Sequence, residues 1–324
     1  RWQRESEEIM VDLTNESDKR EVGVPALEQV YGKSVARAAK RQRNARLGMT
    51  SEGRKPGWGS YAILIVTLLI FVFPLYYALS IASQNTPSNQ YGVRALIPGT
   101  ALLHNLSRAL GELKFWQALG GTVTVAVVVS VSTVFFSTLA GYSFAKLHFR
   151  GRSVLLTAVV ATMTIPQQLT VVPLYIMANK AGLYGNLLAV IIPGLVSAFG
   201  VFWMTQYITD ALPYELIEAA RVDGCSMFRT FISVGVPAAR PAASMLFLFT
   251  FIGQWTNYFW PMLVLGANKS YMLTTAAAAL KGAYFTDYTI VMSGVILTTA
   301  PLLLLFFVAG KQLVAGIMAG AVKG

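Results

Sequence analysis

Uncharged apolar stretches recur along the chain and limit what it can fold into. Each is about 20 residues or longer, the length at which an α-helix crosses the hydrocarbon core of a bilayer. Of the 324 residues, 55% are hydrophobic and only 13% are charged, which is atypical of a water-soluble protein. The sequence therefore predicts an all-α polytopic membrane protein with six transmembrane helices, at residues 61–83, 120–145, 153–178, 186–208, 241–266 and 288–310. Prolines inside several of these spans predict kinks.

Residues suited to disulfides, metal binding or catalysis are scarce. The single Cys225 and two histidines are too few for a disulfide framework, a metal centre or a redox site, and Cys225 is interpreted as a packing residue. The sequence has no phosphate-binding loop of the GxxxxGK[ST] type and no recognisable catalytic motif, so we expect no enzyme activity and no cofactor in this chain. The interiors of the six spans lack charged residues and histidine, which disfavours a carrier coupled to protons or ions.

Charge is concentrated ahead of the first span. Residues 1–60 hold 12 Lys or Arg and 9 Asp or Glu and end in a basic run. Such a run could bind nucleic acid, but before a membrane span it fits the excess of basic residues in cytoplasmic loops, so no nucleic-acid partner is expected. When only the eight residues of the basic run are counted ahead of the first span, sixteen basic residues lie on the side of the amino terminus and six on the other, which predicts that both termini are cytoplasmic. The expected divisions are a polar, partly flexible segment (1–59), a six-helix domain (60–311) and a tail (312–324).

The polar segment between the fourth and fifth spans has a pattern of its own. It predicts two short helices that meet at Gly224, which takes the left-handed conformation of a helix C-terminus. Ser226 caps the second helix and Pro237 ends it, while in the first helix Glu218 can pair with Arg221. Such an element could dock in a groove of another protein or lie on lipid headgroups, and the pattern alone leaves both open.

A family resemblance favours docking. Residues 210–241 resemble the EAA loop of the permeases of binding-protein-dependent ABC importers, with its EAA, DG, F, P and P positions in order at Glu218, Ala219, Ala220, Asp223, Gly224, Phe231, Pro237 and Pro241. Further tracts are similar to the same family, at Gly141–Arg152, Pro173–Tyr175, Gly182–Leu183 and Trp255–Pro261. The tail Gln312–Gly324 resembles that of the maltose-type second permease subunit (MalG-like). The resemblance covers about residues 60–324 and implies the type I importer permease fold.

The resemblance implies how such a chain is coupled to ATP. In this family the EAA loop sits in a cleft of a separate ATP-binding subunit and converts closure of the ATPase dimer into rotation of the membrane helices. Carried over by position, Glu218 and Asp223 contact the ATPase, Gly224 forms the corner, and Phe228 and Phe231 pack in the cleft. The tail reaches the ATPase dimer interface through Gln312, Gly316, Gly320, Lys323 and Gly324.

The resemblance also implies an assembly. The expected partners are a second homologous permease, two copies of an ATP-binding subunit that holds ATP and Mg, an extracytoplasmic sugar-binding protein, and the lipid of a prokaryotic cytoplasmic membrane. A sugar or oligosaccharide is the implied cargo, and an importer of another solute, such as glycerol phosphate or a polyol, remains the alternative. The rival classes are a stand-alone secondary carrier and a membrane scaffold.

Polar and aromatic side chains inside two spans could line a path for a hydroxylated, uncharged cargo. The candidates are Gln167, Gln168, Trp255, Asn257 and Tyr258. The same groups could instead join helices to one another, which is a frequent role of polar residues in membranes. The residues alone leave both interpretations open.

Overall fold

The computed structural model describes residues 57–85, 93–266, 271–281 and 286–321, and these residues form helices and connections with no strand among them. The chain divides into two compact units, Arg1–Val72 and Phe73–Gly324. The first includes the whole segment predicted at 1–59, which lies outside the described residues up to position 56, and the start of α3 (Trp58–Ala82). The large apolar side chains of that part of α3 are exposed, as suits a helix in lipid.

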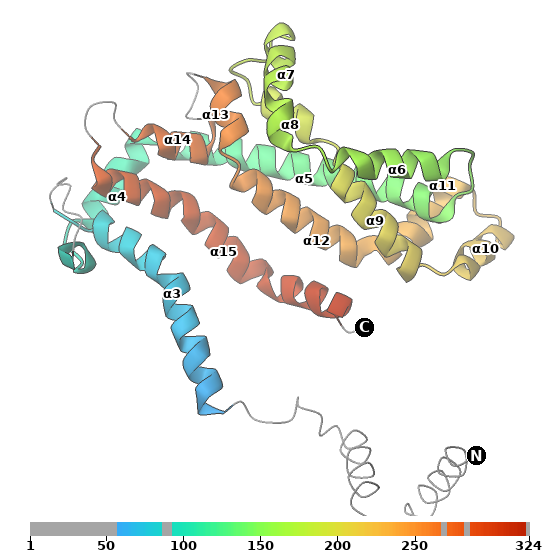
Figure 1. The fold of residues 1–324 in the computed structure, drawn as a ribbon, viewed down its shortest axis with the longest axis horizontal. Helices are drawn as coiled ribbons and strands as arrows, with labels where there is room; N and C mark the ends of the chain where they lie inside the picture. The colour runs from blue at the N-terminus through green and yellow to red at the C-terminus, as the bar shows by residue number, and fades with distance from the viewer. Residues whose placement is uncertain (1–56, 86–92, 267–270, 282–285, 322–324) are drawn as a thin grey trace, which may run out of the picture. The chain divides into compact units, whose positions relative to one another are not determined.

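The second unit contains the end of α3 and the other helices (Figure 1). Those ahead of the predicted loop are η2 (Val93–Leu96), α4 (Leu102–Glu112), α5 (Phe115–Lys146), α6 (Arg152–Thr162), α7 (Gln167–Lys180), α8 (Leu188–Gly194) and α9 (Ala198–Ala211). The loop itself forms α10 (Tyr214–Val222), α11 (Met227–Thr230) and η3 (Phe231–Gly235). Those after it are α12 (Val236–Trp255), α13 (Phe259–Leu265), α14 (Leu273–Ala279) and α15 (Tyr288–Ala321).

The predicted spans correspond to these helices with some changes of boundary. By length and composition, five described segments can each cross a membrane, at Trp58–Ala82, Phe115–Lys146, Leu188–Ala211, Met227–Trp255 and Tyr288–Phe307. A sixth is the pair α6 and α7, which meet at an angle of 92°. The prediction of an all-helical, multi-pass membrane protein is therefore confirmed.

Two of the predicted spans are broken at prolines, as expected. Pro166 lies between α6 and α7 with the extended backbone that ends one helix and starts the next. α8 ends just after Pro193, and the carbonyl groups freed there find partners on α5. The Thr133 hydroxyl donates to the Gly194 carbonyl and the Ser132 hydroxyl to the Leu195 carbonyl, at 3.1 and 3.0 Å. These bonds make a broken helix tolerable at membrane depth.

The fifth span departs from its predicted limits of 241–266. Its helix ends at Trp255, and α13 is a separate short helix. At the other end the prediction that Pro237 ends a short helix was wrong, because α11, η3 and α12 form one segment, Met227–Trp255. η3 is a π-helical turn in which the Val236 N–H reaches back to the Phe231 carbonyl. Such a wide turn leaves room for a proline, which a regular α-helix interior excludes.

The core of the second unit is organised around α5. This helix packs most extensively against α9 and α12, and α12 also packs against α15, which lies beside it in Figure 1. Small residues allow the close approach: a Cβ atom on Gly141 would lie 2.7 Å from the Met204 Cβ, and one on Gly200 would lie 2.3 Å from the Ser137 Oγ. Close contact through small residues is a common way for membrane helices to associate.

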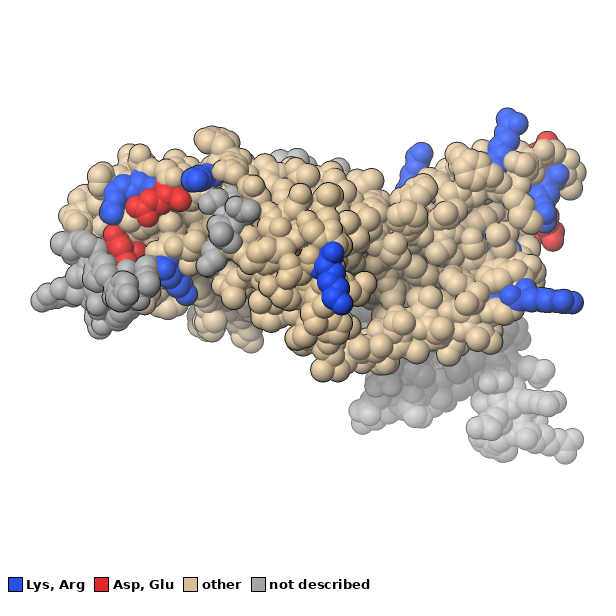
Figure 2. All heavy atoms as spheres, turned by 90° about the horizontal axis from the view of Figure 1, so that it is seen from above, with Lys and Arg blue, Asp and Glu red and all other residues tan. Residues whose placement is uncertain are grey.

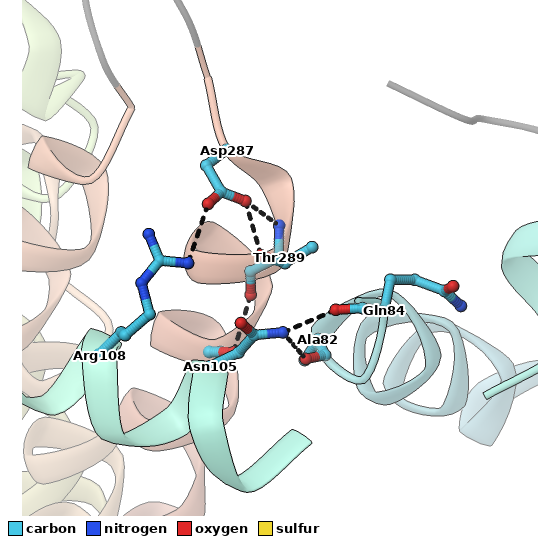
Figure 3. Close-up of polar contacts among 7 residues, drawn as sticks. Ala82, Gln84, Asn105, Arg108, Asp287 and Thr289 are labelled. Carbon is cyan, nitrogen blue, oxygen red and sulfur yellow. Dashed lines mark hydrogen bonds and ion pairs between the residues drawn. The ribbon is translucent and has the colours of Figure 1, made fainter. Parts of the chain in front are cut away.

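At the end of the second unit where α5 begins, polar residues join the helices through hydrogen bonds and an ion pair (Figure 3). The buried Asn105 of α4 donates through Nδ2 to the carbonyl oxygens of Ala82 and Gln84, both at 2.9 Å, and so satisfies the end of α3. The Arg108 Nη1 lies 3.3 Å from Asp287 Oδ2, and Asp287 Oδ1 accepts hydrogen bonds from Thr289 at the start of α15. We call Asn105, Arg108, Asp287 and Thr289 the clasp.

The acidic side chains of the described residues fall into two groups. Glu112 and Asp287 belong to the clasp end, and the others belong to α9, α10 and the corner after α10, at Asp210, Glu215, Glu218 and Asp223. Figure 2 shows acidic side chains near two ends of the visible face, and the broad surface between them is mostly uncharged with isolated Lys or Arg side chains. This separation of charge fits a protein whose middle lies in hydrocarbon.

Candidate functional site

The loop between α9 and α12 contains the corner that the sequence predicted. Gly224 has a φ of +81°, and its N–H donates to the Arg221 carbonyl at 3.0 Å. The Cys225 N–H reaches the Ala220 carbonyl at 3.0 Å, which completes the pair of bonds known as a Schellman motif. The Ser226 hydroxyl then accepts from the Arg229 N–H and caps α11. The predicted corner and cap are therefore confirmed.

Apolar side chains project from both sides of this corner. Val222 is 87% exposed and Phe228 is 67% exposed, and Leu216 and Met227 are more than half exposed. We call these four residues the crest. Glu218 and Asp223 are also exposed, and among the described residues no ion pair joins Glu218 to Arg221, contrary to the pairing that the sequence favoured. The loop thus presents apolar and acidic groups together.

Phe231 does not belong to the crest. Its side chain is only 7% exposed, and its ring lies 5.2 Å from the buried ring of Tyr142, measured between centroids. Phe231 therefore fills the core of its own chain, so Phe228 is the one of the two predicted rings that a partner can reach. Ala219 and Pro237 are exposed, and Ala220 is half-buried behind the corner.

Two residues that the sequence did not single out hold the loop to the helices. The hydroxyl of Tyr214, the first residue of α10, donates to the carbonyl of Lys146 at the end of α5 and lies 2.9 Å from His148 Nδ1. The Lys146 ammonium donates to the Thr209 carbonyl of α9 at 3.1 Å. These partners are more than 60 residues apart in sequence, so no local pattern could have revealed them.

The tail residues are described in part. α15 continues without a break through Gln312, Gly316 and Gly320 and ends at Ala321. Lys323 and Gly324 lie outside the described residues.

The residues proposed for a cargo path are not alike. Gln167 and Gln168 are exposed on the first turn of α7. Trp255, by contrast, is buried and donates through Nε1 to the Thr298 carbonyl of α15, so it serves helix packing. Asn257 accepts a bond from Thr274 through its backbone carbonyl, and Tyr258 is exposed beside it.

Comparison with known proteins places these features in a family. The family described as "Binding-protein-dependent transport system inner membrane component" matches residues 134–318, a range that includes the whole loop. The chain belongs to this family. It is therefore a membrane component of a transport system rather than an enzyme, as the EAA-like residues predicted.

Several curated relatives cover most of the chain. The lactose transport system permease protein LacG of Rhizobium radiobacter is 32% identical over 85% of this chain and 99% of its own length. The arabinooligosaccharides transport system permease protein AraQ of Halalkalibacterium halodurans is 31% identical over 79% and 92%. The sn-glycerol-3-phosphate transport system permease protein UgpE of Escherichia coli O157:H7 is 26% identical over 80% and 95%.

A solved structure supports the fold. A chain of a bacterial ABC transporter involved in the import of the acidic polysaccharide alginate superposes with a TM-score of 0.66 at 22% identity. The match covers 83% of this chain and 97% of that chain. The predicted importer permease fold is therefore confirmed.

Proposed function

We propose that this permease forms one half of the translocation path of an ATP-driven sugar or oligosaccharide importer. The relatives at 31% and 32% identity are named for lactose and arabinooligosaccharides, and the glycerol 3-phosphate permease is less similar at 26%. The six spans predicted from the sequence have no charged residue in their interiors, and Arg229 and Arg240 of the longer described segment Met227–Trp255 lie ahead of the predicted fifth span, whereas a path for a phosphate ester needs basic groups. A neutral, hydroxylated cargo is the better fit.

The single observation that supports a coupling role is the exposure of the crest. Exposed apolar side chains around a rigid glycine corner fit a groove in another protein, because burying them there removes apolar area from water. A position on lipid headgroups fits less well, since interfacial helices are rich in Lys and Arg, whereas here the exposed acidic residues Glu215, Glu218 and Asp223 outnumber the exposed Arg221 and Arg229. The partner of this surface is an ATP-binding subunit, with Phe228 as the inserted ring and Glu218 and Asp223 as its polar contacts.

The rest of the assembly follows from the same assignment. Two ATP-binding subunits supply ATP and Mg, a second permease completes the path, and an extracytoplasmic sugar-binding protein delivers the cargo. The loop end of α5 and both termini then face the cytoplasm, in agreement with the excess of basic residues on that side. The helical tail through Gln312 and Gly316 extends toward the ATPase dimer.

The experiment that tests this function starts from the native membrane. The tagged chain is purified in mild detergent, its partners are identified by mass spectrometry, and the complex is reconstituted with its binding protein. ATP-dependent uptake of lactose or arabinooligosaccharides, with little uptake of glycerol 3-phosphate, is the expected result. Preferred uptake of glycerol 3-phosphate would overturn the cargo class. Transport by the isolated chain without nucleotide would overturn the importer itself.

A further inference from the structure

Both ends of the coupling loop rest on the last turns of one helix, α5. At the end that leads into α12, the Tyr142 ring packs against Phe231, and a Cβ atom on Gly235 would lie 2.9 Å from that ring. At the end that leads into α10, the Tyr214 hydroxyl reaches the Lys146 carbonyl, one turn beyond Tyr142. Movement of the loop therefore has two routes into α5, one through packing, to which Ile217 of α10 also contributes, and one through the hydrogen bond of the Tyr214 hydroxyl.

The hydroxyl of Tyr214 does more than touch α5. The Lys146 carbonyl is among the last four of the helix, which have no partner inside it, so the hydroxyl caps the helix. A hydroxyl has one proton, and here it is donated to the carbonyl. The contact with His148 Nδ1 at 2.9 Å is therefore one in which the imidazole donates and the hydroxyl accepts. One side chain of α10 thus joins the end of α5 to the segment that follows it.

The side chain of Lys146 strengthens this junction. It is 7% exposed, its ammonium donates to the Thr209 carbonyl near the end of α9, and it lies 5.7 Å from the centre of the Tyr214 ring. A buried ammonium is costly without partners, and a carbonyl and an aromatic face are both suitable ones. The ends of α5 and α9 and the start of α10 therefore meet at Tyr214.

α5 is well placed to carry a movement across the membrane. It has 32 residues, and beyond α9 and α12 it packs against α8 and α14, far from the loop. α9 and α10, in contrast, are joined by the short connection Leu212–Pro213, where the chain is extended. Leu212 and Ile217 pack in the core beside Tyr142 and Ala145 of α5, and the hydroxyl adds a hydrogen bond that resists turning of α10 about this connection while α5 stays in place.

We propose that Tyr214 is a positioning residue for energy coupling. Its hydroxyl fixes α10 to the capped end of α5, so that displacement of the crest moves α5 and is not lost in the connection at Leu212–Pro213. This role rests on the proposed function, because the displacement comes from an ATP-binding partner.

The test is Tyr214→Phe in the reconstituted complex, which keeps the ring and removes the hydroxyl. The readout is cargo transported per ATP hydrolysed, together with the yield of assembled complex. The yield stays at the wild-type level, and the ratio falls about three- to tenfold, the effect of losing one hydrogen bond in the coupled movement. Tyr207→Phe on α9 is the matched control and leaves both quantities unchanged.

A second variant tests whether the junction acts as a unit. His148→Ala removes the donor to the Tyr214 hydroxyl and lowers the ratio less than Tyr214→Phe does. The double variant is no worse than Tyr214→Phe alone, because both changes act through the same hydroxyl. Equal and additive losses would contradict this arrangement.

Two outcomes would overturn the role of Tyr214. One is an unchanged ratio in Tyr214→Phe while a variant of the glycine corner still abolishes uptake. The other is a lower yield of complex with an unchanged ratio, which would make the hydroxyl a structural support only. Failure of the proposed function is distinguishable from both, because the wild-type complex would then lack an ATP-binding subunit or ATP-dependent uptake.

Discussion

The two ends of α5 differ in whether the side chains around them contact their own chain or are exposed. At the clasp, Asn105 and Asp287 bond to groups of the same chain, and Arg108 completes an ion pair. At the loop end, the crest exposes Val222 and Phe228 with acidic side chains beside them. The clasp end holds its own helices together, whereas the loop end presents a surface suited to a partner. A change at the clasp should therefore affect mainly the stability of the chain, and a change at the crest should affect mainly coupling.

The largest expected effect is at the corner. Gly224→Val places a β-branched residue at a φ of +81°, which costs about 1–3 kcal/mol and displaces the crest, although no atom lies within 4 Å of the new Cβ. ATP-dependent uptake should fall by about 5- to 150-fold, since a cost of about 1–3 kcal/mol corresponds to that factor in an equilibrium. Gly111→Val at the clasp end, where a Cβ is also unopposed, is the control. Normal uptake by Gly224→Val would refute the corner's role.

A pair of phenylalanines separates docking from stability within the loop. Phe231→Ala empties a buried site beside Tyr142 and should lower the unfolding free energy of the chain by about 3–5 kcal/mol. Phe228→Ala should leave that free energy nearly unchanged and weaken binding of the ATP-binding subunit. Thermal unfolding in detergent and a binding titration measure the two effects. The comparison fails if Phe228→Ala is the more destabilising variant.

Deletion of Gln312–Gly324 tests whether the tail belongs with the coupling surface. Because α15 already spans the membrane by Phe307, we expect normal insertion and yield. Sugar-stimulated ATP hydrolysis by the complex should fall several-fold. Full stimulation in the truncated complex would remove the tail from the coupling machinery.

The smallest effect is expected at the clasp. The Arg108 and Asp287 side chains are 41% and 17% exposed, and such partly exposed ion pairs contribute about 0.2–1 kcal/mol. Arg108→Gln should therefore lower the melting temperature slightly and leave uptake per ATP unchanged. A large loss of uptake with normal stability would show that the clasp end also takes part in coupling.

Sequence reasoning succeeded where a local feature sets the backbone. Gly224 and Ser226 were placed correctly because a left-handed corner and a helix cap depend on residues within one turn. It failed at Pro237, since the π-helical turn that admits this proline is not visible in the residue pattern. It also grouped Phe231 with Phe228, whose rings are neighbours with centroids 6.4 Å apart; Tyr142 covers the Phe231 ring and leaves the Phe228 ring exposed, and the sequence pattern does not show this.

What the sequence determined by itself is the membrane-spanning, helical nature of the chain, the corner of the loop and the family. These depend on the length of apolar runs, on backbone preferences of single residues and on motifs of fixed spacing. The tertiary structure decided which side chains face outward and which residues hold the loop. Tyr214 meets Lys146 across 68 residues of chain, and Arg108 meets Asp287 across 179. Contacts over such separations depend on how the helices pack, and no local pattern in the sequence encodes them.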